Sequence, residues 1–216
     1  RLYQSPKAYI DASNPYHFDS GISMSCPHVS GIIVLLKSLH PKWSTAALKS
    51  AIMTAAFSYD NNGTPIQANG KIPKIADRFN YGAGFVNPNM AADPGLIYDI
   101  EPSDYFKFFN CMGGLGSRDN CTTVKESIAD LNLPSIAIPN LRTFQAMTRS
   151  VTNVDQVNAV YKAFLQPPTG VEMAVDPSVL VFSEEKKVLS FKVNFKAMRR
   201  SIQGDYIFGS PLQFAL

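Results

Sequence analysis

The segment from Gly21 to Gly31 holds the residues with the clearest potential for chemistry. It places Ser23 directly before an apolar run, Val29 to Leu36, that is compatible with a helix. A serine at the start of a helix lies beside free backbone N–H groups and the positive end of the helix dipole. Such surroundings suit an activated serine and the oxyanion that its attack creates. A lone serine at a helix start is usually only a cap, so this placement by itself makes Ser23 a candidate for a nucleophile and no more.

Two helices are predicted around this serine. In the first, from Ser23 to about His40, apolar residues recur at three- and four-residue steps: Val29, Ile32, Ile33, Leu36 and Leu39. Pro27 is tolerated because it falls in the first turn, and His40-Pro41 ends the helix with His40 as a C-terminal cap. Ser44 is the expected N-cap of the second helix, about Thr45 to Ala56.

The rest of the chain has short helices and loops first and β-prone segments after them. Residues 66–80 are predicted as polar loop, and residues 90–93 and 104–109 as short helices. Gly82-Ala83-Gly84 is interpreted as a tight backbone bend, not a phosphate-binding loop. After Cys121, β-prone runs are separated by turns; they are residues 160–165, 171–175, 180–182, 189–195 and 206–208. Several short strands at this spacing predict a β-sandwich.

The composition excludes several classes of function. Hydrophobic residues make up 45% of the 216 residues, charged residues make up 17%, and the net charge is +3. Because Lys and Arg are scattered, we expect no nucleic-acid partner. No apolar run is found of the roughly 18–20 residues that span a bilayer, so we expect no membrane association. No residue spacing suits zinc or calcium, and we therefore expect no cofactor.

The segment Gly21-Ile22-Ser23-Met24-Ser25-Cys26-Pro27-His28-Val29-Ser30-Gly31 resembles the nucleophile motif of the plant-type subtilisin-like serine proteases, the subtilases. Later phrases follow the family pattern in order, among them His40-Pro41-Lys42-Trp43-Ser44 and Asp93-Pro94-Gly95-Leu96-Ile97-Tyr98-Asp99. The similarity runs from about Phe18 to Ser210. The competing Gly-x-Ser-x-Gly nucleophile elbow is rejected, because Ser25 stands at its fifth position and no strand pattern precedes Gly21.

The resemblance implies the fold class and the domains. Residues 1–120 would be the C-terminal part of an α/β subtilisin-like catalytic domain, and residues 121–216 a fibronectin-III-like all-β sandwich. Family members continue with a further strand pair where this chain has residues 210–216, so we expect an incomplete sandwich of reduced stability. The chain begins at Arg1 and its first methionine is Met24, which we interpret as the mark of a fragment.

The resemblance also implies the chemistry. Ser23 would be the nucleophile of a serine endopeptidase acting on polypeptide substrates. In the family the catalytic His and Asp and an oxyanion Asn precede the serine, and their motifs are not found here, so we expect this chain to be inactive alone. His17 and Asp19 lack the family context. His28 is turned about 140° around the helix from Ser23 and is interpreted as a packed, hydrogen-bonded histidine.

One departure from the family lies directly beside the nucleophile. Subtilases usually have threonine where this chain has Ile22. Isoleucine cannot donate a hydrogen bond to an oxyanion, so we expect a rate penalty on the order of tenfold or more. Two alternatives to a protease segment stay open: a catalytically inactive binding module that uses the sandwich, and a truncated gene relic. The oligomeric state, including a homodimer, is also left open.

The cysteines and two sequons fit a secreted protein. Cys111 and Cys121 would suit a disulfide in an oxidising compartment, with Cys26 as an unpaired buried thiol. Asn62-Gly63-Thr64 and Asn120-Cys121-Thr122 are N-glycosylation sequons, although such triplets also arise by chance. The family resemblance implies an extracellular location, in the apoplast or cell wall.

Overall fold

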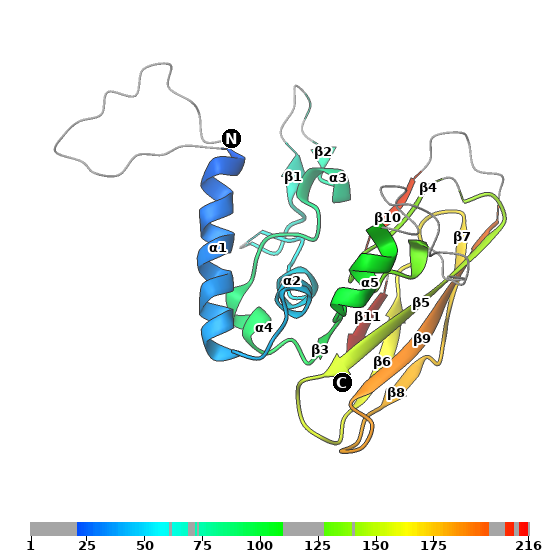
Figure 1. The fold of residues 1–216 in the computed structure, drawn as a ribbon. Coiled ribbons are helices and arrows are strands. Elements are labelled where there is room, and N and C mark those ends of the chain that lie inside the picture. Colours follow the sequence, from blue (N-terminus) through cyan, green and yellow to red (C-terminus); the bar gives the residue numbers. More distant parts are fainter. Residues whose placement is uncertain are drawn as a thin grey trace.

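The computed structural model describes residues 21–198 except 61, 69–71, 73, 110–127 and 140, together with the strands at 206–209 and 212–215. Figure 1 shows a helical unit, which carries the predicted serine helix, followed by a β-sandwich. This order confirms the predicted fold class. The predicted domain boundary, between residues 120 and 121, lies outside the described residues.

Three helices form the helical unit. Helix α1 (Ile22–Leu39) and helix α2 (Thr45–Thr54) both contact the short helix α4 (Pro88–Ala92). Their shared core consists of Leu36, Leu48, Ala51 and Ala91. Ser44 caps α2 as predicted, because its hydroxyl oxygen accepts the N–H of Ala47 at 2.9 Å. The helix ends two residues earlier than expected.

Helix α1 corrects one expectation from the sequence. Its 18 residues have a mean hydropathy of 1.4, which is long and apolar enough to cross a membrane. The sequence hides this run because Ser25, His28 and Lys37 interrupt it. A core helix of a soluble protein meets the same test, and α1 packs against α2 and α4 through Leu36.

Between α2 and α4 the chain makes short, local structures. Strand β1 (Gln67–Ala68) pairs with strand β2 (Lys74–Ile75), and helix α3 (Arg78–Tyr81) follows. The predicted bend at Gly82-Ala83-Gly84 is confirmed, and Gly84 has φ +135°. A Cβ on Gly84 would lie 2.6 Å from the carbonyl oxygen of Phe57, so only glycine fits this approach.

The sandwich packs a four-stranded antiparallel sheet against smaller strand groups. The large sheet has the order β3 (Leu96–Ile97), β5 (Phe144–Asn153), β9 (Val188–Ala197), β7 (Val171–Asp176). The second group has the order β11 (Leu212–Ala215), β6 (Val160–Leu165), β8 (Val179–Val181). Strand β10 (Tyr206–Gly209) pairs with β4 (Ile136–Pro139). Helix α5 (Pro102–Lys107) and the 3-10 helix η3 (Ile128–Asp130) lie between β3 and β4 in the sequence.

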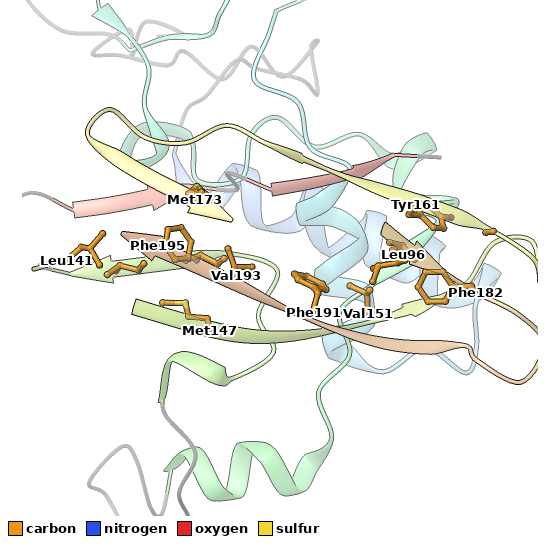
Figure 2. Packing of buried hydrophobic residues seen from close by; sticks show 14 residues of the cluster. Leu96, Leu141, Met147, Val151, Tyr161, Met173, Phe182, Phe191, Val193 and Phe195 are labelled. Carbon is orange, nitrogen blue, oxygen red and sulfur yellow. The ribbon is translucent and has the colours of Figure 1, made fainter. Parts of the chain in front are cut away.

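Alternating side chains build the core of the sandwich. On β9, Phe191, Val193 and Phe195 are buried and alternate with the exposed Lys192 and Lys196. Figure 2 shows this row facing side chains from neighbouring strands and loops, including Leu96, Leu141, Met147, Val151, Tyr161, Met173 and Phe182. This alternation is the period-two pattern of a strand with one face in the core.

All five predicted strand runs overlap strands in the structure: β6, β7, β8, β9 and β10. At the end of the chain, where we expected the final strand of the family to be missing or replaced, residues 212–215 form β11 and pair with β6. A ladder needs only backbone N–H and C=O groups, so the departure in sequence did not prevent pairing. The long strand β5 was not predicted at all.

Candidate active site

Ser23 lies in the first turn of α1 and its side chain is exposed. The residue before the helix, Gly21, has φ +153° and makes no side-chain cap. Its carbonyl oxygen accepts the N–H groups of Met24 at 3.1 Å and Ser25 at 3.2 Å. The first N–H groups of a helix have no acceptor within that helix. The N–H of Ser23 therefore belongs to the set that can bind an anionic oxygen beside the hydroxyl.

Ile22 stands at the first position of α1 and is 88% exposed. Its side chain offers carbon only, directly beside the serine. The hydrogen-bonding groups of this turn are therefore backbone N–H groups and serine hydroxyls. The hydroxyl of Ser25 donates to the carbonyl of Gly21 at 3.3 Å and is engaged in the turn itself.

His28 does not act on Ser23 in this geometry. Its Nδ1 lies 2.6 Å from the carbonyl oxygen of Met24, one helical turn back, and donates to it. The predicted hydrogen bond is therefore present. The predicted packing is wrong, because the ring is exposed. The imidazole is therefore hydrogen-bonded to the backbone of its own helix and not to Ser23.

Cys26 corrects a second expectation, because the thiol is free and exposed, not buried. The physical reason is the distribution of contacts along α1. Its buried residue, Leu36, and the partly buried Ile32 and Ile33 all lie in the C-terminal half, where α2 and α4 pack. The half that carries Ser23 and Cys26 is open in the part of the chain that the structure describes.

The opposite end of α1 is fixed by several bonds. His40 is the C-cap as predicted, with its N–H donating to Leu36 at 2.8 Å. Its ring stacks on Trp43 at 3.8 Å, and its Nε2 lies 2.8 Å from the carbonyl oxygen of Ala92. Lys37 donates to the carbonyl of Trp43 at 2.6 Å. These contacts hold the serine helix to α2 and α4.

The sequon at Asn62 lies in an exposed turn closed by Asp60. The Asp60 carboxylate accepts the Thr64 hydroxyl at 2.7 Å, the Thr64 N–H at 2.9 Å and the Asn62 N–H at 2.8 Å. These bonds, the Thr64 hydroxyl first, lower the pKa of Asp60. The other predicted sites, Cys111, Cys121 and Asn120, lie outside the described residues, as do His17 and Asp19.

A cavity of about 690 Å³ that the sequence did not reveal is lined from α5, η3, β5 and their flanking loops. Its lining residues include the carboxylates of Asp99, Asp104 and Asp130 and the guanidinium of Arg149. Arg149 is 5% exposed and donates to the carbonyls of Ala129 at 2.6 Å and Leu133 at 3.0 Å. No lining residue comes from α1. Among the described residues no cluster of His, Cys, Asp and Glu suits a metal ion.

Two family models match the chain in the order of its two parts. Residues 5–84 match the Subtilase family, and residues 130–212 match the Fibronectin type-III domain. The first range contains α1 and Ser23. The second contains strands β4 to β10 and the first residue of β11.

Relatives in Arabidopsis thaliana extend this likeness over nearly the whole chain. This chain is 47% identical over 209 residues to "Subtilisin-like protease SBT3.15", and the match covers 92% of this chain and 27% of that protein. It is 46% identical over 218 residues to "Subtilisin-like protease SBT3.12", covering 97% of this chain and 29% of that protein. The chain thus spans just over a quarter of the length of these relatives. It belongs to the subtilase family, and it joins a segment of the subtilisin-like protease to a fibronectin type-III domain.

Proposed function

We propose that this chain is part of a serine endopeptidase in which Ser23 attacks the scissile carbonyl of a polypeptide substrate. The observation that carries the proposal is the placement of Ser23, exposed in the first turn of α1 within the range that matches the Subtilase family. Its hydroxyl and its backbone N–H leave the helix at the same end. One can form the acyl bond while the other stabilises the oxyanion.

In this proposal the general base and its orienting carboxylate come from other parts of a longer protein. His28, the histidine nearest to Ser23 in the described sequence, is bonded to the carbonyl of Met24 and cannot serve. The relatives are more than three times as long as this chain, which leaves ample room for both groups. The 216 residues alone are then inactive, since loss of a triad member costs several orders of magnitude in rate.

The surface of α1 supports a larger catalytic unit. Val34, Leu35 and Leu39 are 67%, 65% and 64% exposed. They form an apolar face away from the contacts with α2 and α4, and such a face is costly to leave in water. We assign this face to contact with the rest of the peptidase domain.

Location and modification complete the proposal. We place the protein outside the cell, with Asn62 as an N-glycosylation site because its turn is exposed. Cys111–Cys121 remains the proposed disulfide and Asn120 the second proposed glycosylation site. Glycosylation of Asn62 is tested by the intact mass before and after glycosidase treatment, with Asn62→Gln as the variant.

The test of catalysis is a peptide-hydrolysis assay of the longer protein that contains these residues. Ser23→Ala is expected to lower kcat/KM by about 10⁴-fold or more while leaving the fold intact. Ser25→Ala is the matched control, because it removes a hydroxyl from the same turn that is bonded to Gly21. Equal activity of the Ser23→Ala protein and the unmutated one would contradict the assignment. If the 216 residues alone hydrolysed the peptide and Ser23→Ala abolished that activity, the base and its carboxylate would not come from other parts of a longer protein.

One observation favours the alternative of a binding module. The outer face of β6 and β8 carries Val160, Phe164, Val179 and Val181, all between 41% and 58% exposed. Val160 and Val181 are cross-strand partners, as are Lys162 and Val179, so these side chains form an apolar strip that one lysine interrupts. If binding through this strip is the function, Phe164→Ser abolishes it and Ser23→Ala does not.

A further inference from the structure

Strand β3 belongs to the sandwich although it follows the helical unit directly. Its backbone pairs with β5, with Leu96 opposite Asn153 and Ile97 opposite Thr152. Leu96 is part of the sandwich core, and the neighbouring Tyr98 packs against it. Just before the strand, the carbonyl of Gly95 accepts the N–H of Val154 at 2.9 Å. The strand therefore cannot leave the sandwich without breaking this ladder.

Helix α2 of the helical unit also contacts β3, so the same segment touches both parts of the structure (Figure 1). The hydroxyl oxygen of Ser50 is fully buried and accepts the N–H of Tyr98 at 2.9 Å. The hydroxyl of Ser44, the N-cap of α2, donates to the carboxylate of Asp99. Two successive residues after β3 are thus bonded to two serines of one helix.

Asn132 closes the arrangement from the loop after η3. Its Nδ2 donates to the carbonyls of Asp99 and Ser150, both at 2.8 Å. Its Oδ1 accepts the N–H of Ser150 at 2.9 Å. One amide therefore links the segment bonded to α2 with the central strand β5. Asn132 is half-buried, and a half-buried amide that loses its partners exchanges them only partly for water, so these bonds resist separation.

We propose that Ser44, Ser50, Asp99 and Asn132, here called the β3 clamp, join the helical unit and the sandwich into one cooperative folding unit. The sandwich then acts as a scaffold that fixes α2, and through α2 the C-terminal half of the serine helix. The proposal does not depend on catalysis, because it concerns how the two parts hold each other. The bonds that carry it run from Ser44 and Ser50, in the range that matches the Subtilase family, to residues 98–99. From there they run to Asn132, in the range that matches the Fibronectin type-III domain.

The chain provides a reporter for each part. Trp43 is its only tryptophan, and it stacks on His40 where α1 meets α2, so its fluorescence reports the helical unit. Hydrogen exchange measured by mass spectrometry on a peptide from β9 reports the sandwich. Both are followed through urea unfolding of the 216-residue chain. We expect one shared midpoint for both reporters in the unmutated protein.

Loss of the clamp is expected to separate the two transitions. Ser50→Ala removes the acceptor of the Tyr98 N–H, and Asn132→Ala removes the link to β5. In each variant the Trp43 midpoint should fall below the β9 midpoint by about 0.5 M urea or more. Asn132→Asp is the milder variant if either of these fails to fold, because it keeps the acceptor for Ser150 and removes only the two donated bonds.

The matched control is Ser190→Ala. It removes the exposed hydroxyl bond between Ser150 and Ser190, 2.8 Å long, from the same sheet and leaves the clamp intact. Its two midpoints should stay together. Two separate transitions in the unmutated chain would overturn the proposal. So would coincident transitions in every clamp variant that folds. Neither result touches the assignment of Ser23, which is tested by peptide hydrolysis.

Discussion

The ring of Tyr98 meets the ring of Phe191 edge-on, with centroids 6.5 Å apart and planes at 75°. Phe191 is 2% exposed and lies on β9, in the middle of the sandwich. Tyr98 follows β3, in the segment that α2 also contacts through Ser50. The contact packs this segment onto the sandwich core, in the geometry that aromatic quadrupoles favour. It also places a phenol in a poorly solvated position.

The stability of the protein is expected to fall in alkali because of this phenol. Desolvation raises the pKa of Tyr98 to about 12 from an ordinary value of 10.0, with Arg149 acting in the opposite direction. The folded state thus holds the proton more tightly than the unfolded chain. The stability is fully present below pH 10 and is lost as pH rises from about 10 toward 12.

Urea midpoints measured from pH 8 to 11 test this dependence. Two pKa units correspond to about 2–3 kcal/mol at the high-pH limit. Tyr98→Phe should reduce the slope above pH 10, since it removes the titrating hydroxyl and keeps the ring. Desolvation also raises the pKa of Tyr161 to about 12, so some slope should remain. An unchanged slope in Tyr98→Phe would contradict the assignment to Tyr98.

Gly84→Ala is expected to destabilise the helical unit by about 2–4 kcal/mol. The added Cβ would collide with the carbonyl oxygen of Phe57 at 2.6 Å, in a backbone with φ +135°. Gly63→Ala is the control, because Gly63 also has positive φ but no atom within 4 Å of the added Cβ. It should cost only about 1 kcal/mol. Equal losses in the two variants, by urea unfolding, would show that the close approach is not what matters.

Phe195→Ala should cost about 3–5 kcal/mol, since it opens a cavity in a fully buried part of the core. Phe164→Ala is the matched comparison on the neighbouring sheet, where the side chain is 56% exposed. Its cost should stay below about 1 kcal/mol. Thermal or urea unfolding of the two variants side by side measures the difference. A similar loss for both would mean that the outer strip is covered in solution.

Ile22→Thr in the longer protein should raise kcat/KM on the order of tenfold, because a hydroxyl beside Ser23 adds a donor for the oxyanion. Ile22 is 88% exposed, so the stability of the fold should hardly change. Ile22→Val is the control, since it keeps the branch and adds no donor. A gain in Ile22→Val equal to that in Ile22→Thr would assign the effect to bulk and not to hydrogen bonding.

Helical periodicity and end signals were enough to predict α1, α2 and the cap at Ser44. They are local properties, because a cap and an apolar stripe depend on neighbours three and four residues away. The strands with clean alternation, β7 and β9, were predicted for the same reason. Strand β5 was hidden because Arg149 occupies an inward position between Met147 and Val151. Carbonyls of Ala129 and Leu133, 20 and 16 residues away in the sequence, are among the acceptors that make that charge acceptable there.

The sequence predicted the order of the two parts, and its resemblance to a family motif made Ser23 the proposed nucleophile, since a motif is itself a local arrangement. Burial and long-range pairing needed the tertiary structure. Cys26 was expected inside and lies outside, and the final strand was expected to be missing or replaced where residues 212–215 pair with β6. The bonds of Ser50 and Asn132 to the segment after β3 cross 48 and 33 residues. A one-dimensional pattern cannot show such contacts, because the free energy of burying a group depends on which distant groups surround it in the folded chain.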